Sequence, residues 1–331
     1  MTMDNKQYLP PDSNTFIGRI RNLRAWAAYR HWQKRLSKLI GQDRISMLEC
    51  GCGPGFLSKN IKQWFPNITA TLTDYEYVLL QRARAETNSV VIQCDAETLP
   101  LESASFDLVI SFHMIEHLVD PKHFIDEAYR VLKPNGYFIY ATPNPDGLPA
   151  RILKQKWSGI REDHIALHTP TEWYSMTTKG GFKLLEEGTT TLSGLSFLKL
   201  PPFNLINNGL LFIFGFFPWK LGESYTGIYQ KDGGENNSNA ANLLNINTME
   251  RIGYNELVDR YSNPEQVSDF QASIKDVLDR NTITTQFDTL SFYLCSSGES
   301  AYIIVDEIPL LSTKFKISLT PNLVTSTSRQ K

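Results

Sequence analysis

A glycine-rich segment near residue 50 holds the residue types best suited to binding a ligand. An apolar run over residues 45–48 is followed by Glu49 and then by Gly51, Gly53 and Gly55. Glycine accepts positive φ angles and lets a ligand approach the backbone where a Cβ atom would intrude. This order of residue types predicts a short buried strand, a turn and the start of a helix, with a nucleotide-like molecule lying against the turn.

The spacing of the glycines distinguishes two classes of ligand. A dinucleotide site places its third glycine three positions after the second, so that a pyrophosphate lies at the helix N-terminus. Here that position is Phe56, and Gly55 comes one residue early. The carboxylate of Glu49 would also repel a pyrophosphate and attract a cationic ligand such as S-adenosylmethionine. The segment therefore favours a cationic nucleoside cofactor over NAD.

The same residues resemble the first motif of the class I S-adenosylmethionine-dependent methyltransferases, in the small-molecule branch that includes the ubiquinone- and menaquinone-type enzymes. That motif reads acidic-x-Gly-x-Gly-x-Gly, and its fixed positions are matched by Glu49, Gly51, Gly53 and Gly55. The resemblance covers about residues 46–231, and it implies S-adenosylmethionine as cofactor and S-adenosylhomocysteine as product. For the motif alone, the alternative is a chance glycine-rich loop.

A second carboxylate follows the next β-rich segment. Asp74 ends the segment 68–74 and stands 25 residues after Glu49, the length of one helix and one strand. Both carboxylates are then expected at the carboxyl edge of adjacent parallel strands, where Asp74 can accept hydrogen bonds from both ribose hydroxyls. Asp74 is also suited to be a helix N-cap, which is compatible with the same role.

A third carboxylate, Asp95, ends the segment 89–95. Together with Ala96 it resembles the place where the family sets an acid against the adenine amino group, a donor that suits a carboxylate. An ordinary turn residue is the alternative for Asp95. We also assign to the cofactor site four residues that adjoin these strand ends: Cys52, Tyr75, Ser111 and Phe112.

Three histidines are the candidates for chemistry on the methyl acceptor. His164 lies on a predicted loop before a helix. It is our first candidate for a general base, because histidine titrates near neutrality and a hydroxyl acceptor must lose a proton as it attacks. A capping or merely exposed histidine is the alternative. His113 and His117 follow the predicted strand 105–112 and are further catalytic candidates.

His113, Glu116 and His117 also spell the zinc-protease motif H-x-x-E-H. The motif directly follows a strand of the predicted nucleoside fold, where the family usually carries an acidic-His pair, and no distal third ligand is indicated. Some ubiquinone-pathway O-methyltransferases hold a divalent metal here with two Glu and a His, but His113 stands where their first Glu would be. We therefore predict no peptidase chemistry and assign no metal ligand, while dependence on a divalent metal stays open as a hypothesis that an acceptor assay with and without chelator would decide.

The predicted elements form a doubly wound α/β fold, the Rossmann-like fold that the resemblance implies, with a mostly parallel sheet of seven strands. Strand-like segments alternate with helical ones, which indicates parallel strands joined by helices. The predicted strands cover residues 45–49, 68–74, 89–95, 105–112, 137–143, 181–187 and 223–229, the last two antiparallel. A helix around 124–132 and a turn at 133–136 precede the fifth strand, and Asn135 in this turn tolerates a left-handed backbone.

Composition shifts divide the chain into four parts. These are an N-terminal arm and cap helix (1–44), a cofactor-binding domain (45–231), a linker (232–246) and a small C-terminal α+β appendage of unknown role (247–331). A helix expected over 16–40 either covers the cofactor, as the resemblance implies, or packs as a basic surface helix. The appendage is expected to contain helices near 249–261 and 265–280 and strands near 289–295 and 301–308.

An apolar insertion over residues 195–222 separates the last two predicted strands. Its apolar run at 209–219 is too short to span a bilayer, which needs about 20 residues. Three interpretations remain open: a lid over a lipid-like acceptor, a peripheral membrane contact through residues 205–219, and an ordinary buried or dimer-forming helix.

Composition bounds the class of protein. The 331 residues are 41% hydrophobic, enough for one large core and a second small unit. The 33 basic and 35 acidic residues give a net charge of -2, which disfavours a nucleic-acid partner. Four cysteines without metal-ligand or disulfide spacing fit a reducing compartment, and no signal core is recognisable. We expect a cytoplasmic protein, with association to a membrane surface as an open alternative.

These features together predict a methyltransferase. It would move a methyl group from S-adenosylmethionine to an oxygen or nitrogen atom of a small-molecule, lipid-like or peptidic natural-product acceptor. A NAD-dependent oxidoreductase and a non-catalytic nucleoside-binding module are the two alternatives.

Overall fold

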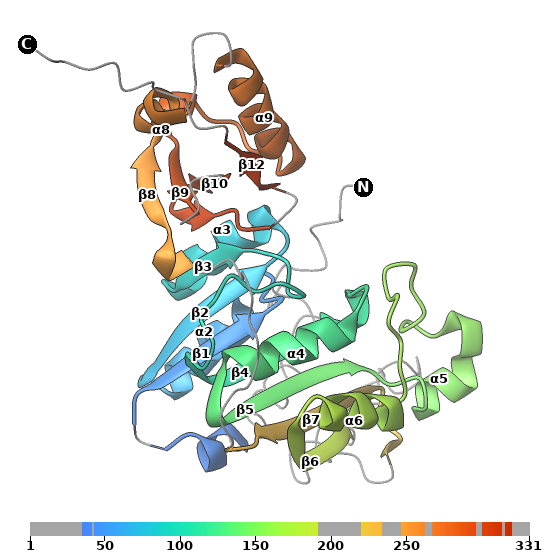
Figure 1. Ribbon diagram of the computed structural model, residues 1–331. Coiled ribbons are helices and arrows are strands. Elements are labelled where there is room, and N and C mark those ends of the chain that lie inside the picture. Colours follow the sequence, from blue (N-terminus) through green and yellow to red (C-terminus); the bar gives the residue numbers. More distant parts are fainter. Residues whose placement is uncertain are drawn as a thin grey trace, which may run out of the picture.

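The computed structural model describes residues 35–41, 43–190, 220–233, 246–261, 267–295, 300–312 and 315–319 (Figure 1). Of the helix expected over 16–40, only the end lies within these ranges, where residues 35–39 are helical. Most of the N-terminal arm, the linker and the apolar insertion, including the proposed membrane contact at 205–219, lies outside the described residues.

The main sheet confirms the predicted fold class. Its seven strands run in the order β3-β2-β1-β4-β5-β7-β6. The strands are β1 (Ile45–Cys50), β2 (Ile68–Asp74), β3 (Val90–Gln93), β4 (Phe106–Phe112), β5 (Leu132–Pro143), β6 (Phe182–Thr190) and β7 (Ser224–Lys231). The pairs formed among β1 to β5 are parallel, whereas β7 is antiparallel to both β5 and β6. The carboxyl ends of β1, β2 and β4 therefore meet at one edge of the sheet.

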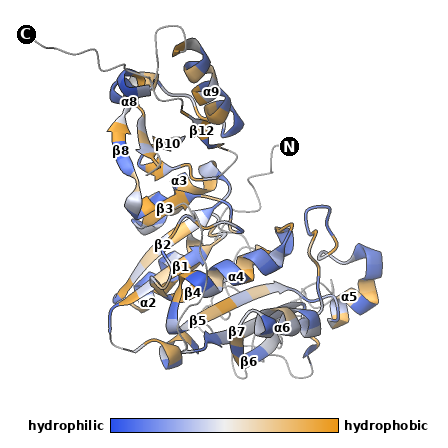
Figure 2. Ribbon diagram, viewed as in Figure 1, coloured by the Kyte–Doolittle hydropathy of each residue, from blue (hydrophilic) through white to orange (hydrophobic). Residues whose placement is uncertain are grey.

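Helices cover both faces of this sheet. They are α2 (Phe56–Trp64), α3 (Tyr77–Thr87), α4 (Pro121–Val131), α5 (Leu148–Leu153) and α6 (Pro170–Lys179), with short 3-10 helices η2 (Ile115–His117) and η3 (Lys154–Lys156). Successive strand residues point to opposite faces. Met47 accordingly joins the cluster that contains residues of α2 and α3, and Leu48 joins the cluster that contains residues of α4 and α6. The colours in Figure 2 mark hydrophobic residues along the central strands of the sheet.

The start of β5 differs from the sequence prediction. The turn expected at 133–136 lies within β5, which already begins at Leu132 and pairs there with Phe106 before a register shift. Asn135 has a φ of 64°, so the expected left-handed residue is confirmed. Helix α4 begins three residues earlier than expected, because the side chain of Asp120 accepts hydrogen bonds from the Lys122 and His123 backbone N–H groups and Pro121 occupies the first turn.

The C-terminal residues form a second sheet in the order β11-β10-β9-β8, with β12 paired to β10. Its elements are η6 (Ile246–Thr248), β8 (Glu250–Gly253), α8 (Tyr254–Tyr261), α9 (Val267–Arg280), η7 (Phe287–Thr289), β9 (Ser291–Leu294), β10 (Ser300–Val305), β11 (Ile308–Pro309) and β12 (Ile317–Ser318). The helix expected near 249–261 begins only at Tyr254, since residues 250–253 pair with β9.

This second sheet lies beyond β3, next to α3 (Figure 1). The backbone N–H of Leu311 donates a hydrogen bond of 2.7 Å to the carbonyl of Gln93, and Gln93 and Leu310 form a parallel bridge. The Tyr77 hydroxyl donates to the Asp306 carboxylate at 3.0 Å. The C-terminal unit therefore continues the main fold and covers the edge strand β3, which would otherwise present unpaired backbone groups.

None of the helices within the described ranges is long and apolar enough to cross a lipid bilayer.

A buried ion pair joins α4 to the segment that carries Asp95. The guanidinium of Arg130 donates to both carboxylate oxygens of Glu127, at 2.7 and 2.8 Å, and to the carbonyl oxygens of Leu99 and Leu101. Glu127 in turn accepts the backbone N–H of Leu99 at 2.7 Å. Both ionic side chains are largely buried. This network holds the 95–101 segment against α4.

We predict that Arg130→Met lowers the free energy of unfolding by about 3–5 kcal/mol, because it leaves the Glu127 carboxylate buried without its counter-ion. Urea denaturation measures the change. Lys122→Met is the matched control on the same helix, since Lys122 pairs with Asp126 at the surface and is 60% exposed. The control should cost at most about 0.5 kcal/mol. Equal losses in the two variants would contradict the role given to the buried network.

Candidate cofactor and acceptor site

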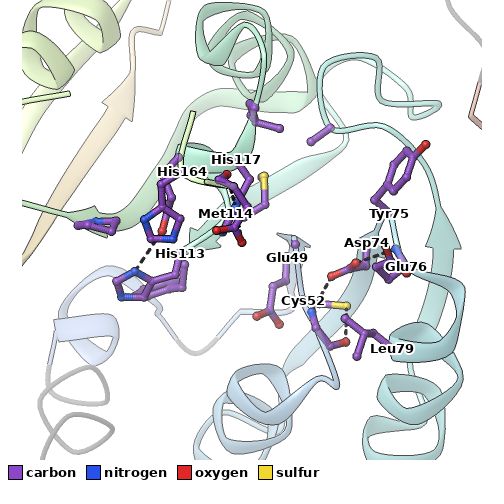
Figure 3. A pocket seen from close by; sticks show the side chains of 18 of the residues that line it. Glu49, Cys52, Asp74, Tyr75, Glu76, Leu79, His113, Met114, His117 and His164 are labelled. Carbon is purple, nitrogen blue, oxygen red and sulfur yellow. Dashed lines mark hydrogen bonds and ion pairs between the residues drawn. The ribbon is translucent and has the colours of Figure 1, made fainter. Parts of the chain in front are cut away.

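A cavity of about 1030 Å³ lies at the carboxyl ends of β1, β2 and β4. Figure 3 shows its labelled side chains: His113, His117 and His164 lie on one side, Asp74 and Tyr75 on the other, and Glu49 between them. The sheet order places the three strand ends side by side, as the spacing of the carboxylates in the sequence predicts.

The glycine turn after β1 is held by backbone groups at the end of β2. The N–H groups of Gly51 and Cys52 donate to the carbonyl of Thr73 at 2.8 and 3.0 Å. The N–H of Gly53 donates to a carboxylate oxygen of Asp74 at 2.8 Å. Gly51 and Gly53 have φ angles of 69° and 52°, so the turn uses the left-handed backbone that glycine accepts.

Close packing also constrains Gly51. A Cβ atom on Gly51 would overlap the side chain of Met114, whereas one on Gly53 would meet no atom within 4 Å. Since Gly53 lines the cavity, the open space beside it belongs to the ligand site. A ligand can therefore lie directly against the backbone of Gly53.

Two residues assigned to the cofactor site from the sequence do not line the cavity. Gly55, with a φ of 78°, precedes α2, and a Cβ atom there would lie 3.0 Å from Ala83 of α3, so this glycine permits α2 and α3 to pack closely. Ser111 is fully buried within β4, away from the cavity. Successive strand residues face opposite sides of the sheet, so Phe112 reaches the cavity and Ser111 does not.

Glu49 is 3% exposed, and its carboxyl group accepts a hydrogen bond from the hydroxyl of Ser58. Burial raises the pKa of Glu49 to about 8; the Ser58 hydroxyl opposes this rise and the charge of Asp74 adds to it. At neutral pH the group is thus mostly protonated until a cation enters. The negative charge inferred from the sequence is therefore formed by binding, because an ammonium or sulfonium group stabilises the carboxylate.

Asp74 organises the opposite part of the site. One of its oxygens accepts from Gly53 and the other accepts the backbone N–H of Glu76 at 2.9 Å. Burial raises the pKa of Asp74, and these backbone hydrogen bonds oppose the rise. Each carboxylate oxygen has a second lone pair, so Asp74 can still accept bonds from a pair of ribose hydroxyls.

The residues expected near adenine adjoin Asp74. Tyr75, Asp95 and Ala96 line the cavity, as does Cys52 at the glycine turn. Asp95 also accepts the backbone N–H of Glu97 at 3.0 Å, which is the contact expected of an ordinary turn residue. Asp95 therefore forms the turn and lines the cavity. The site thus combines a glycine turn with the carboxyl groups of Glu49 and Asp74 at two strand ends. This combination fits a nucleoside that carries a positive charge.

Glu116 and three histidines lie in the other half of the cavity. Glu116 is 1% exposed, and among the described residues its carboxylate accepts no hydrogen bond. His113 Nδ1 lies 3.4 Å from this carboxylate, an ion-pair distance without hydrogen-bond geometry. His117 and His164 lie with their rings perpendicular and their centroids 4.8 Å apart. The three catalytic candidates from the sequence are thus brought together.

Backbone carbonyls set the tautomers of two of these histidines. His117 Nδ1 lies 2.8 Å from the Asp163 carbonyl, and His164 Nδ1 lies 2.8 Å from the Gly159 carbonyl. A carbonyl only accepts, so each Nδ1 carries the proton and each Nε2 keeps a lone pair. Burial lowers the pKa of His164, which favours its neutral form. His164 therefore presents a basic nitrogen and is not a simple capping residue.

One part of the cavity wall contains residues that the sequence analysis missed. Trp157 and Ser158 both donate to the carboxylate of Glu223, at 3.3 and 3.1 Å, and Ser224 lies beside them. These contacts connect the segment after η3 to the start of β7. Ser158 and Glu223 are 65 residues apart in the sequence. Their signal in the sequence is weak, because residues 144–159 show only that turn-forming residues are frequent there.

Comparison with known proteins identifies the central part of the chain. Residues 48–140 match the family model described as a methyltransferase domain. The chain is 35% identical over 114 residues to a probable S-adenosylmethionine-dependent methyltransferase of Mycolicibacterium smegmatis, a match that covers 34% of this chain and 42% of the relative.

Two further relatives carry more specific names. A malonyl-[acyl-carrier protein] O-methyltransferase of Enterobacter lignolyticus is 34% identical over 127 residues, which is 38% of this chain and 49% of the relative. The 2-methyl-6-phytyl-1,4-hydroquinone methyltransferase 1 of Oryza sativa is 32% identical over 143 residues, covering 42% and 41%. The matches span less than half the length of each of these three relatives.

Residues 48–140 are thus a methyltransferase domain of the class I, S-adenosylmethionine-dependent kind, and the resemblance stated from the sequence is confirmed. The matched range contains the glycine turn, Asp74, Asp95 and the His113–His117 segment. It ends before His164 and Glu223, so the second half of the cavity lies partly outside the shared domain.

We predict that, without ligand, Glu49→Gln becomes more stable relative to the wild-type protein between pH 6 and pH 9. The folded pKa of about 8 exceeds the ordinary value of 4.5, so the wild-type protein loses stability as pH rises through this interval and the loss is complete above it. The glutamine amide does not ionise, so the stability of the variant relative to wild type should rise by about 1–3 kcal/mol from pH 6 to pH 9. Thermal and urea unfolding at the two pH values measure the difference.

The same substitution should weaken binding of S-adenosylhomocysteine, whose ammonium group loses its carboxylate. Glu86→Gln is the control, because Glu86 is an exposed carboxylate that pairs with Lys59. A stability difference between Glu49→Gln and wild type that is the same at both pH values would disprove the assignment of the raised pKa to Glu49.

Proposed function

We propose that this chain transfers a methyl group from S-adenosylmethionine to an oxygen or nitrogen atom of a small-molecule, lipid-like or peptidic acceptor. The observation that carries this proposal is that one cavity contains both halves of such a site. Glu49, Gly53 and Asp74 line the part suited to a cationic nucleoside, and His164 and His117 present basic nitrogens in the other part.

The proposed reaction needs a methyl donor, a group that accepts a proton and walls that position the reactants. When bound, S-adenosylmethionine supplies an electrophilic methyl group on a positively charged sulfur, and transfer leaves S-adenosylhomocysteine. A lone pair of the acceptor atom forms the new bond to the methyl carbon while the carbon–sulfur bond breaks. His164 Nε2 accepts the proton that a hydroxyl acceptor loses. The largest effect expected of the cavity walls is to hold the two reactants in line and to exclude water.

An oxygen acceptor is favoured by the basic groups in the cavity. A neutral amine attacks through its own lone pair, whereas a hydroxyl group needs a base to become a good nucleophile. The Nε2 atoms of His117 and His164 in the other half of the cavity supply that basicity. Two relatives are named for malonyl-[acyl-carrier protein] and for a phytyl hydroquinone, and these names support an oxygen-bearing or lipid-like acceptor.

Ligand binding separates this proposal from its alternatives. We expect S-adenosylhomocysteine to raise the melting temperature of the protein and NAD to leave it unchanged, because Phe56 occupies the position of the third glycine of a dinucleotide turn. Incubation with S-adenosylmethionine and a panel of hydroxylated acceptors, followed by mass spectrometry, then detects S-adenosylhomocysteine. A shift with NAD alone would favour an oxidoreductase, and binding without turnover of any acceptor would favour a nucleoside-binding module.

Substitutions should separate cofactor binding from turnover. Asp74→Ala removes the acceptor for the ribose hydroxyls and for the Gly53 N–H, so the Kd for S-adenosylhomocysteine should rise about 10- to 100-fold. His164→Ala should leave this Kd unchanged and lower kcat by about 10²- to 10⁴-fold. His168→Ala is the control for a histidine of the same segment that lies outside the cavity. Unchanged kcat in His164→Ala would remove His164 from the catalytic set.

A further inference from the structure

We propose that Glu116, His117 and His164 form a binding site for one divalent first-row transition-metal ion in the acceptor half of the cavity. Glu116 and His117 come from η2, and His164 comes from a loop 47 residues later in the chain. One potential ligand atom from each of the three residues lies within 4.8 Å of the other two. The structure thus supplies the distal third ligand that the H-x-x-E-H motif lacked in the sequence.

The buried carboxylate is the first observation that points to a cation. Glu116 is 1% exposed, and neither of its oxygens accepts a hydrogen bond from the described residues. Leaving an ionised group buried without hydrogen bonds is costly, and such groups are normally paired or bound to metals. The ion pair with His113 at 3.4 Å involves only one of the two oxygens. The second oxygen remains available to a cation.

The orientation of the two imidazoles is the second, independent observation. His117 and His164 each donate their Nδ1 proton to a backbone carbonyl, that of Asp163 and that of Gly159, at 2.8 Å. Metal-binding histidines almost always donate their other ring N–H in this way, because the bond fixes the tautomer and raises the basicity of the ligating nitrogen. Both Nε2 lone pairs are therefore directed away from these carbonyls and can bind an ion.

The loop that carries His164 is attached to η2. The backbone N–H of Ala166 donates to the carbonyl of Glu116 at 2.9 Å. Ligand atoms about 2.1 Å from one ion lie roughly 3–3.5 Å apart in tetrahedral geometry. The present spread of up to 4.8 Å needs only a small rotation of side chains whose backbones are already connected.

The donor set selects the class of metal. Two imidazole nitrogens and one carboxylate suit zinc, iron, cobalt or nickel, and they disfavour magnesium and calcium, which prefer oxygen ligands. His113 is not part of the cluster, although it occupies the position of the first glutamate in the ubiquinone-type pattern. Three protein ligands leave coordination positions open toward the cavity.

The role of the ion rests on the proposed function. An acceptor hydroxyl bound at an open position would lose its proton more easily, because the metal acts as a Lewis acid and lowers the pKa of a bound oxygen. His164 Nε2 would then act as a ligand and the ion would replace it as the group that activates the acceptor. Metal binding itself requires neither the cofactor nor turnover.

Titration of tag-free, EDTA-treated protein with Co²⁺ tests the site, because cobalt bound by nitrogen and oxygen ligands gives visible absorption bands. We expect bands that saturate at one Co²⁺ per chain, that Zn²⁺ abolishes and that excess Mg²⁺ leaves unchanged. Glu116→Gln, His117→Asn and His164→Asn should each weaken Co²⁺ binding by at least about 10- to 100-fold. His168→Asn, in the same segment but outside the cluster, should bind as wild type does.

The absence of cobalt bands in the wild-type protein would overturn the proposal, as would wild-type affinity in His164→Asn or displacement by Mg²⁺. Binding of S-adenosylhomocysteine to the metal-free protein and to each variant is measured in parallel. It verifies that the variants are folded, and it tests the proposed function separately. A protein that binds the nucleoside but no Co²⁺ loses only the metal site, and one that binds Co²⁺ but no nucleoside loses only the proposed function.

Discussion

The site depends on a backbone connection between two strand ends. Parallel pairing of β1 and β2 brings Thr73 and Asp74 next to the turn after β1, where the Thr73 carbonyl and the Asp74 carboxylate accept three backbone N–H groups. Gly51 and Gly53 make these bonds from a left-handed backbone, and at Gly51 the contact with Met114 excludes any Cβ atom. The register of β1 and β2, the conformation of the turn and the access of a ligand to its backbone therefore depend on one another.

The burial of Glu49 in the sheet sets the electrostatics of the site. The carboxyl group of Glu49 lies at the end of a central strand, where little water reaches it, and its pKa rises to about 8. A charge in this place is unfavourable until a cation arrives, so the cation and the carboxylate stabilise each other when they meet. A cationic ligand therefore explains why an acidic residue occupies this buried position.

The fold and the cofactor half of the site could be predicted from the sequence because their signals are local. Apolar runs ending in a carboxylate, such as 68–74, mark strands and also place Asp74 at the correct edge of the sheet. Side-chain direction was predicted less well. Ser111 and Phe112 were both assigned to the site, but adjacent strand residues face opposite sides and only Phe112 reaches the cavity. Gly55 belongs to the motif by spacing, yet its role in the structure is the packing of α2 against Ala83.

The acceptor half could not be predicted in the same way, because its residues meet only through long-range contacts. His117 lies on a single 3-10 turn and not on a long helix, and His113 precedes that turn with a φ of 55°. The zinc-protease motif needs its two histidines on one face of a helix, so the same letters adopt a different geometry here. The partner of Glu116 and His117 is His164, and the Asp163 and Gly159 carbonyls that orient the two rings belong to the same loop. Since that loop lies beyond the region matched by the methyltransferase family, substitutions in the loop can alter the proposed acceptor chemistry without disturbing the backbone bonds that form the glycine turn.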